Sequence, residues 1–459
     1  MDCFFLHSGK NLKKEITILL MPLGIIALAD YLKENGLTVK ILNLSLAKIE
    51  NKTFSLIDFL KKNKPRILCL SLHWHQQLFE VISLSNEIKR IFPSLKIILG
   101  GWTASYFYRE IMKNYKSIDF IIRGESEDPL LELAKRILTK KNNFEDIPNL
   151  SWRKGDLIVN NKQIYCTPLF LFNKLRFSNF NLVINKKFCL KGLWGLNKNA
   201  DSKDYREREN IFFYNPGRGC LVNCSFCSGS NLTQKILNGK SRVIFKTKSS
   251  VIRDLRESKW HGIGSIYTCF DPKPFSNYYP NLFKLIRKEK LCFKMNFECW
   301  SLPTKKFIDS FKNTFNPDSR LIISPESGSE RVRRLNKGFF YTNKDLLRTI
   351  RYLKEKEVEI ELYFTTGLPF ETKKDFIETV IFIKYLRKKF KFKLSAHPIE
   401  IEPCSLMYLN SSKYKIKLKR KSFEDFVRDS SRPVFSLGYE TNYFKEEEII
   451  SNVNLLRNL

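Results

Sequence analysis

The sequence predicts an α/β protein in which two parallel β-sheets follow one another along a chain of 459 residues. Three observations support this prediction. Strand-like apolar runs alternate with amphipathic helical runs over residues 1–140, the alternation breaks over residues 141–210, and it returns over residues 211–405. Strands that alternate with helices of this length form parallel sheets with helices on both faces. Residues 406–459 are expected to form a short, mostly helical C-terminal tail.

Residues 1–140 are expected to form a doubly wound (Rossmann-like) parallel sheet. Its strands are predicted from apolar runs at residues 2–7, 37–44, 66–72, 95–101 and 117–125. Its helices are predicted from helical periodicity at residues 22–36, 78–92 and 128–138. Ligands of such sheets bind beyond the carboxyl ends of the strands. The segments expected there are His73–His75, Gly100–Thr103 and Gly124–Glu125.

Residues 141–210 are polar and irregular, and we interpret them as a linker with a hairpin that turns at Gly155–Asp156. The strands expected after the linker fall at residues 211–217, 265–270, 293–300, 320–327, 359–367 and 393–401. Six strand–helix units are fewer than the eight of a closed barrel. The sequence therefore predicts a partial (β/α)6 TIM-type barrel over residues 211–405.

The overall composition narrows the class of protein. The net charge is +33, and the densest basic stretches are Arg387–Lys393 and Lys413–Lys421. We interpret both as solvated faces in preference to a polyanion site, so a nucleic-acid partner is open but not favoured. No apolar run reaches the length of a membrane span, and the first residues do not resemble a signal peptide. We expect a cytoplasmic protein.

The 11 cysteines are an odd number in a long chain, which favours a metal site in a reducing compartment over a disulfide framework. Cys220, Cys224 and Cys227 have the spacing Cys-x3-Cys-x2-Cys between glycines. Thiolates hold iron–sulfur clusters, and three of them leave one iron open. Zinc is the competing metal, but a structural zinc site needs four ligands. The nearest further candidates, Cys189 and Cys269, are distant in the sequence.

This motif, with Phe226 directly before its last cysteine, resembles that of the radical S-adenosylmethionine (SAM) superfamily. The resemblance implies a [4Fe–4S] cluster whose open iron is chelated by the amino and carboxylate groups of SAM. One electron then cleaves the sulfonium, and the 5′-deoxyadenosyl radical abstracts a hydrogen from the substrate. An electron donor such as flavodoxin or ferredoxin is implied as a partner.

Further segments match the family at the ends of successive predicted strands. Phe270-Asp271-Pro272 ends the second strand, although the family's Gly-Gly-Glu is absent there. Glu402-Pro403-Cys404 resembles the family's Pro-Gly-Thr on the sixth strand, with cysteine replacing glycine. The other matching strand ends carry Glu298 on the third, Glu326-Ser327-Gly328 on the fourth and Gly367-Leu368-Pro369 on the fifth. The residues that the resemblance implies for SAM binding are Asp271, Glu298, Glu326, Ser327, Gly367 and Pro369.

Three segments of residues 1–140 carry a second resemblance: Met21–Gly24 leading into a helix, Gly100–Ser105 and Gly124–Glu127. With these segments, residues 1–140 resemble the cobalamin-binding domain that precedes many radical SAM cores. The resemblance implies cofactor contacts at Gly100, Gly101 and Thr103. The Asp-x-His-x-x-Gly loop, which gives some cobalamin enzymes a histidine ligand to cobalt, is missing. We therefore expect the lower face of cobalt to be unligated or bound to water. His73 or His75 is the alternative ligand, and a domain that binds no cofactor also remains open.

The predicted function is that of a cobalamin-dependent radical SAM enzyme, with methyl transfer to an unactivated carbon of a small-molecule or peptide substrate. Ring formation, ring contraction and dehydration fit the same architecture. One alternative is a cobalamin-independent radical SAM enzyme that modifies RNA or a peptide. A second cluster expected of methylthiotransferases is absent, because Cys3 and Cys69 stand alone. The other alternative is a non-catalytic iron–sulfur scaffold or sensor.

Overall fold

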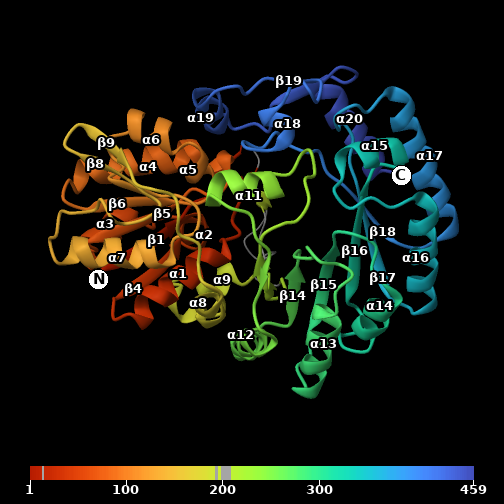
Figure 1. Cartoon of the computed structure of the whole chain (residues 1–459), viewed down its shortest axis with the longest axis horizontal. Coiled ribbons are helices and arrows are strands. Elements are labelled where there is room, and N and C mark those ends of the chain that lie inside the picture. The colour runs from red at the N-terminus through yellow and green to blue at the C-terminus, as the bar shows by residue number, and fades with distance from the viewer. Residues whose placement is uncertain (13–14, 192–194, 198–207) are drawn as a thin grey trace.

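The computed structural model describes residues 1–12, 15–191, 195–197 and 208–459. The N-terminal sheet and the second sheet stand beside each other, and the C-terminal tail crosses over the top from one to the other (Figure 1). This arrangement confirms the α/β fold class. Because both sheets are built from strand–helix units, each presents the loops at the carboxyl ends of its parallel strands as a potential site.

The N-terminal sheet has seven strands within the described residues, in the order β4-β1-β5-β6-β7-β8-β9. The parallel strands are β1 (Cys3–His7), β4 (Val39–Asn43), β5 (Ile67–Ser71), β6 (Lys96–Gly100) and β7 (Phe120–Ile122). These are the five strands that the sequence predicts. The chain passes from β1 to β4 on one side and then to β5 on the other. The strand order therefore reverses between β1 and β5, which is where ligands of such sheets bind.

Helices cover both faces of this sheet. The predicted helices are confirmed as α1 (Leu23–Glu34), α4 (Leu78–Ile91) and α7 (Glu127–Leu138). Four shorter helices were not predicted: α2 (Leu44–Glu50), α3 (Leu56–Asn63), α5 (Trp102–Tyr106) and α6 (Tyr108–Asn114). They have eight residues or fewer, so each holds about two turns of periodic pattern. Side chains alternate along β1, with Phe4 in one hydrophobic cluster and Phe5 in the other.

The segment predicted as a linker contributes to both the sheet and the core. Its hairpin is confirmed, and β8 (Leu150–Lys154) pairs antiparallel with β7 and with β9 (Leu157–Asn160). The N-terminal sheet therefore continues beyond residue 140.

The following residues form the helices α8 (Leu169–Lys174), η2 (Phe180–Leu182) and α9 (Lys186–Cys189). Figure 1 shows this segment, in yellow, between the two sheets. Phe172, Phe177 and Phe180 are buried in the hydrophobic cluster that both sheets share, so the expectation of a polar linker is wrong here. A small antiparallel sheet joins β10 (Gly195–Asn197) to β3 (Glu15–Thr17) and β2 (Lys10–Asn11). Residues 192–194 and 198–207 of the linker lie outside the described residues.

The second sheet is an open array of parallel strands, as predicted. In the part of the chain that the structure describes, its order is β11 (Ile211–Phe213), β14 (Ser265–Thr268), β15 (Lys294–Cys299), β16 (Arg320–Glu326), β17 (Glu359–Phe364) and β18 (Lys393–Ala396). Its helices are α11 (Asn231–Asn238), α12 (Lys248–Trp260), α13 (Tyr278–Lys288), α14 (Lys305–Lys312), α15 (Glu330–Asn336), α16 (Asn343–Glu355) and α17 (Lys373–Lys389). A short ribbon of β12 (Gly217–Arg218) and β13 (Ile244–Phe245) precedes the second strand of the barrel.

The tail joins the two halves of the molecule. It contains α18 (Leu406–Leu409), α19 (Phe423–Ser431), α20 (Glu446–Arg457) and an unpredicted strand pair, β19 (Ile416–Leu418) with β20 (Tyr439–Thr441). Phe423 and Phe426 of α19 pack in the core of the N-terminal sheet, whereas Val453 and Leu456 of α20 pack with the second sheet. The tail therefore restrains the position of one sheet relative to the other.

The basic stretches are solvated faces with one exception. The lysines and the arginine of Arg387–Lys393 are exposed, as are the four lysines at alternate positions from Lys413 to Lys419. Arg420 is the exception, because only 3% of its surface is exposed and its guanidinium pairs with Glu400 and Asp429. No helix in the described part of the chain is long and apolar enough to cross a membrane.

Candidate functional site

A cavity of about 770 Å³ lies between the carboxyl edges of the two sheets. Apolar and aromatic side chains form most of its wall, and loops from both sheets reach it. Seven of the residues predicted as site residues line this cavity: Gly100, Gly101, Cys220, Cys224, Cys227, Glu298 and Glu326. The structure thus brings together positions that are as far as 226 residues apart in the chain, from Gly100 to Glu326.

The three cysteines lie on one loop between β12 and α11. The loop enters through Gly219, whose φ of 98° lies in the left-handed region, and a Cβ there would approach the Arg242 carbonyl oxygen to 1.7 Å. Only glycine fits this turn without displacing the backbone. The loop leaves through Ser230, whose hydroxyl accepts a hydrogen bond from the Thr233 amide and caps α11. Both ends of the cysteine loop are therefore fixed by local structure.

Backbone amides point at two of the three sulfur atoms. Gly229 donates to Cys227 Sγ and Gly338 donates to Cys224 Sγ, both at 3.2 Å. Such donors stabilise thiolate charge, so they suit sulfurs that bind iron. Without a metal, burial raises the pKa of all three thiols, and that of Cys227 to about 12. Within the described residues, no three His, Cys, Asp or Glu side chains are arranged to hold a single metal ion.

Two carboxylates face the cavity from neighbouring strands of the second sheet. Glu298 accepts a hydrogen bond from the Tyr267 hydroxyl at 2.9 Å, and Glu326 lies 3.4 Å from Lys337 Nζ. Burial raises the pKa of both carboxyl groups, although Lys337 opposes the rise. Sequence reasoning missed Tyr267 and Lys337. Lys337 directly precedes Gly338, which donates to Cys224 Sγ, but this contact joins residues 114 apart and so left no local signal in the sequence.

Asp271 and Ser327 lie close to the cavity but do not line it. Asp271 is 4% exposed, and burial raises its pKa to about 8 although the Trp300 backbone amide donates to it. The Ser327 hydroxyl is fully buried against the Thr379 hydroxyl at 3.0 Å. Their contact with SAM stays a prediction.

The Gly367–Pro369 turn is covered by the tail. Tyr439 donates to the Gly367 carbonyl oxygen at 3.0 Å, and Asn336 donates to the Pro369 carbonyl oxygen at 2.9 Å. The turn does not line the cavity, so its predicted contact with SAM also stays a prediction. Glu371, from the same turn, accepts hydrogen bonds from the Gly367 and Leu368 amides and holds the turn closed.

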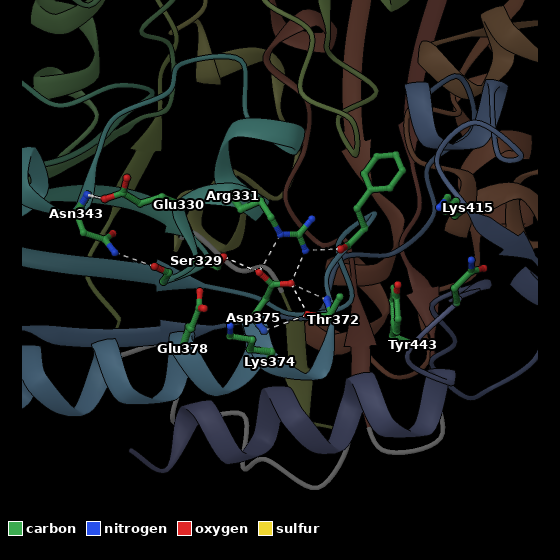
Figure 2. A pocket seen from close by; sticks show the side chains of 13 residues that line it. Ser329, Glu330, Arg331, Asn343, Thr372, Lys374, Asp375, Glu378, Lys415 and Tyr443 are labelled. Carbon is green, nitrogen blue, oxygen red and sulfur yellow. Dashed lines mark hydrogen bonds and ion pairs between the residues drawn. The ribbon is translucent and has the colours of Figure 1, made fainter.

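A second pocket of about 560 Å³ opens beside this turn, at the start of α17 (Figure 2). Asp375 lies at its centre and is bonded to Arg331, Ser329 and Thr372. The Arg331 guanidinium also donates to the Phe370 carbonyl oxygen at 2.8 Å. Because these polar groups already form hydrogen bonds and an ion pair with one another, we assign them a role in holding α15 and α17 together.

Close packing shapes the edge of the N-terminal sheet. Gly101 has a φ of 116°, and a Cβ there would approach the Leu72 carbonyl oxygen to 2.4 Å. Thr103 is buried outside the cavity lining, and its hydroxyl donates to the His73 carbonyl oxygen at 2.9 Å. Thr103 thus holds the neighbouring loop, while its predicted contact with a cofactor stays a prediction. The His73 ring lines the cavity.

His75 is turned away from the cavity. It begins the 3-10 helix η1 (His75–Gln77), is 2% exposed, and its Nε2 lies 3.0 Å from a Glu400 carboxylate oxygen. Arg420 lies against the same pair, 2.7 Å from Glu400. Of the two candidate cobalt ligands, His75 is therefore ruled out by its contacts.

Charged pairs fasten the two edges to one another. Arg218, two residues before the first cysteine, lies 2.6 Å from Glu127 at the start of α7. Arg242 lies 2.8 Å from Glu125 of the same N-terminal loop. Glu127 is almost fully buried, so the bridge is shielded from solvent. The loop that holds the cysteines is thereby held directly against the N-terminal domain.

Comparison with known families identifies both sheets. The model of the radical SAM superfamily matches residues 214–383, which include the cysteine loop and the four strands β14 to β17 of the second sheet. Residues 214–383 form a radical SAM domain. The model of the B12 binding domain matches residues 12–134, so the N-terminal sheet of this radical SAM protein is a B12-binding domain.

Individual relatives are distant. The chain is 23% identical over 276 residues to hopanoid C-3 methylase of Methylococcus capsulatus, covering 57% of this chain and 45% of the relative. It is 24% identical over 322 residues to anaerobic magnesium-protoporphyrin IX monomethyl ester cyclase of Cereibacter sphaeroides, covering 65% and 46%. The chain thus spans less than half the length of these curated relatives.

The fold of this radical SAM protein matches that of TsrM from Kitasatospora setae, a radical SAM methyltransferase solved with cobalamin and a [4Fe–4S] cluster bound. The TM-score is 0.72 at 14% identity, covering 99% of this chain and 89% of TsrM. The residues present fit these groups. Three cysteines, two of which accept hydrogen bonds from backbone amides, suit a cluster, and a cavity walled by glycines and aromatic rings suits a large flat cofactor.

Proposed function

We propose that this radical SAM protein is a cobalamin-dependent methyltransferase that acts on an unactivated carbon. The observation that supports the proposal is the shared cavity, which the cysteine loop lines from one side and Gly100 and Gly101 line from the other. When bound, the cluster and SAM would supply a radical that removes a substrate hydrogen, and cobalamin would supply the methyl group. The cluster, SAM, cobalamin and the substrate must meet within one cavity for this chemistry.

The protein's own residues would bind and shield these groups. Cys220, Cys224 and Cys227 would hold the cluster, and Lys337 places a positive charge beside Cys224. Trp300 lines the cavity with its indole N–H bonded to the Cys269 carbonyl oxygen at 3.1 Å, so its ring is held in place. Aromatic walls of this kind exclude water, which would otherwise intercept a reactive intermediate.

The electron that starts the reaction would come from a low-potential protein such as flavodoxin or ferredoxin. The substrate would be a small molecule or a peptide that enters the cavity between the two sheets. Both partners are proposals that follow from the chemistry of the superfamily. Ring formation by the same cofactors is the second candidate function, and the similarity to the cyclase of Cereibacter sphaeroides favours it among the other outcomes.

Anaerobic reconstitution tests the proposal. The protein is loaded with iron, sulfide and hydroxocobalamin, desalted, and analysed for iron, cobalt and retained small molecules by mass spectrometry. SAM and dithionite are then added. We expect four irons and one cobalamin per chain, and slow release of 5′-deoxyadenosine. A loaded cluster without cobalamin would favour the cobalamin-independent alternative, and a loaded cluster that never cleaves SAM would favour the scaffold.

A further inference from the structure

The described residues place three histidines at the carboxyl edge of the N-terminal sheet, and two of them are engaged in other contacts. His7 Nε2 lies 3.0 Å from the Ile18 carbonyl oxygen, and His75 is held by Glu400. The His73 ring has no hydrogen-bonded partner among the described residues, and it lines the cavity. A half-buried imidazole with an unused nitrogen lone pair is a potential metal ligand.

His73 lies where this fold places its ligands. It follows β5, and the strand order reverses between β5 and β1. The loop after β1 is not free to supply a ligand, because it folds back into the β2–β3 ribbon. The Gly9 amide in that loop donates to the Ser45 hydroxyl at 2.9 Å. The loop after β5 is therefore the one that presents an imidazole at the switch point.

Neighbouring residues fix the backbone of His73 on both sides. Its carbonyl oxygen accepts hydrogen bonds from the Thr103 hydroxyl at 2.9 Å and the Thr103 amide at 3.3 Å. Its amide donates to Gln77 Oε1 at 3.2 Å. Trp74 and Trp102 meet the imidazole edge to face, with ring centroids 4.7 and 6.4 Å away. A ligand held in this way needs little reorganisation when a metal binds.

The chemistry of this side of the cavity favours a neutral nitrogen ligand. Imidazole is a good ligand for first-row transition metals such as cobalt. The two carboxylates nearby, Glu125 and Glu127, are engaged by Arg242 and Arg218.

We propose that a ring nitrogen of His73 coordinates the cobalt of bound cobalamin from the side of the N-terminal sheet. This inference rests on the proposed function only in that cobalamin binds, and it holds for any reaction that the cofactor performs. It replaces the expectation of an unligated or water-bound lower face. The coordination forms one bond from nitrogen to cobalt and requires no change of oxidation state.

Electron paramagnetic resonance of cobalt(II) tests the assignment directly. The full chain is produced with ¹⁵N-labelled histidine in a histidine auxotroph, reconstituted with unlabelled hydroxocobalamin, desalted and reduced with dithiothreitol, which leaves the cluster in its silent oxidised state. A histidine ligand would split each cobalt line into a doublet, because ¹⁵N has spin one half. The cofactor's own benzimidazole nitrogen would give a triplet instead.

The doublet would support His73, and it should disappear in His73→Ala while cobalamin is retained. The control His261→Ala should keep the doublet, because that ring packs against Phe180 outside the cavity. A triplet, or lines without nitrogen splitting, in the wild-type protein would overturn the inference while leaving the cobalamin site intact. A doublet that persists in His73→Ala would also overturn it. Failure to retain any cobalamin would refute the proposed function as well.

Discussion

The two sheets turn the same edge toward one cavity, but the side chains at those edges differ. At the second sheet, polar groups that face the cavity have polar partners. Cys224 accepts an amide hydrogen bond, Glu326 pairs with Lys337, and Glu298 accepts from a tyrosine. A site that holds a charged cluster and a charged cofactor needs such prearranged donors and charges, because unpaired charges are costly where water is excluded.

At the N-terminal sheet, the loops mainly hold one another. Gly101 packs on the Leu72 backbone, and Thr103 anchors the backbone of His73. Among the described histidines at this edge, His73 lines the cavity. The two edges therefore differ in their roles. The second edge carries the thiols and carboxylates, whereas the first edge carries closely packed loops on which a flat ligand can lie. The following changes test each edge separately.

The largest effect is expected from removing the three cysteine thiols of the second edge. Changing Cys220, Cys224 and Cys227 together to Ala should abolish iron binding and SAM cleavage, because no thiolate would remain on the loop. Iron and sulfide content after anaerobic reconstitution, together with 5′-deoxyadenosine release, measures the loss. Cys292→Ala is the matched control, since this cysteine is exposed and should leave both measurements unchanged. Four irons retained by the triple variant would contradict the assignment.

The connection between the two edges should be the next most sensitive feature. Arg218→Met removes the cation that pairs with the buried Glu127 and should cost about 3 kcal/mol, because it leaves an uncompensated buried carboxylate. Denaturant unfolding followed by circular dichroism measures the change. The control Arg136→Met breaks an ion pair with the exposed Asp146 and should cost less than about 1 kcal/mol. Equal losses of unfolding free energy in the two variants would show that the Arg218–Glu127 pair contributes no more to stability than an exposed ion pair.

Close packing at the first edge should matter almost as much. Gly101→Ala adds a Cβ against the Leu72 backbone at a positive φ and should destabilise the protein by about 2 kcal/mol. It should also reduce the retention of hydroxocobalamin after desalting, because the shifted backbone would alter the surface beneath the ligand. Gly36→Ala is the control, since its φ is also positive but a Cβ there meets nothing within 4 Å and the residue does not line the cavity. Full retention in Gly101→Ala would argue against this surface as the cobalamin site.

The two edges also differ in how much of them the sequence could predict. Every strand of the two parallel arrays was predicted, because β-rich apolar runs between helical runs are local signals. The cysteines were found because their spacing lies within eight residues. The missed features depend on contacts between distant residues. Arg218 and Glu127 are 91 residues apart, and His75 and Glu400 are 325 residues apart.

The same reasoning explains the errors in the middle of the chain. Residues 161–191 look irregular because their buried phenylalanines follow no strand or helix period, yet they fill the space between two sheets. Nothing within the segment indicates that a second sheet will cover it. The role of Thr103 was similarly hidden, because the carbonyl that it binds belongs to a loop 30 residues earlier.

The last expected effect is a pH dependence at the second edge, where Asp271 is buried and no cation among the described residues pairs with it. Burial raises its pKa to about 8, whereas an unfolded aspartate has a pKa of about 3.9. Between these values the unfolded chain has lost a proton that the folded protein keeps, so stability falls as the pH rises from about 4 to 8.

Asp271→Asn removes the ionisation and keeps an acceptor for the Trp300 amide. Its unfolding free energy should equal that of the wild type near pH 4 and exceed it by an increasing margin as the pH rises toward 8. Urea unfolding at a series of pH values measures this difference, with the exposed Asp156→Asn as the control whose difference should not vary with pH. A constant difference for Asp271→Asn would mean that this carboxyl group ionises freely. In that case Asp271 would resemble the other polar groups of the second edge, which have polar partners, although the described residues show no cation beside it.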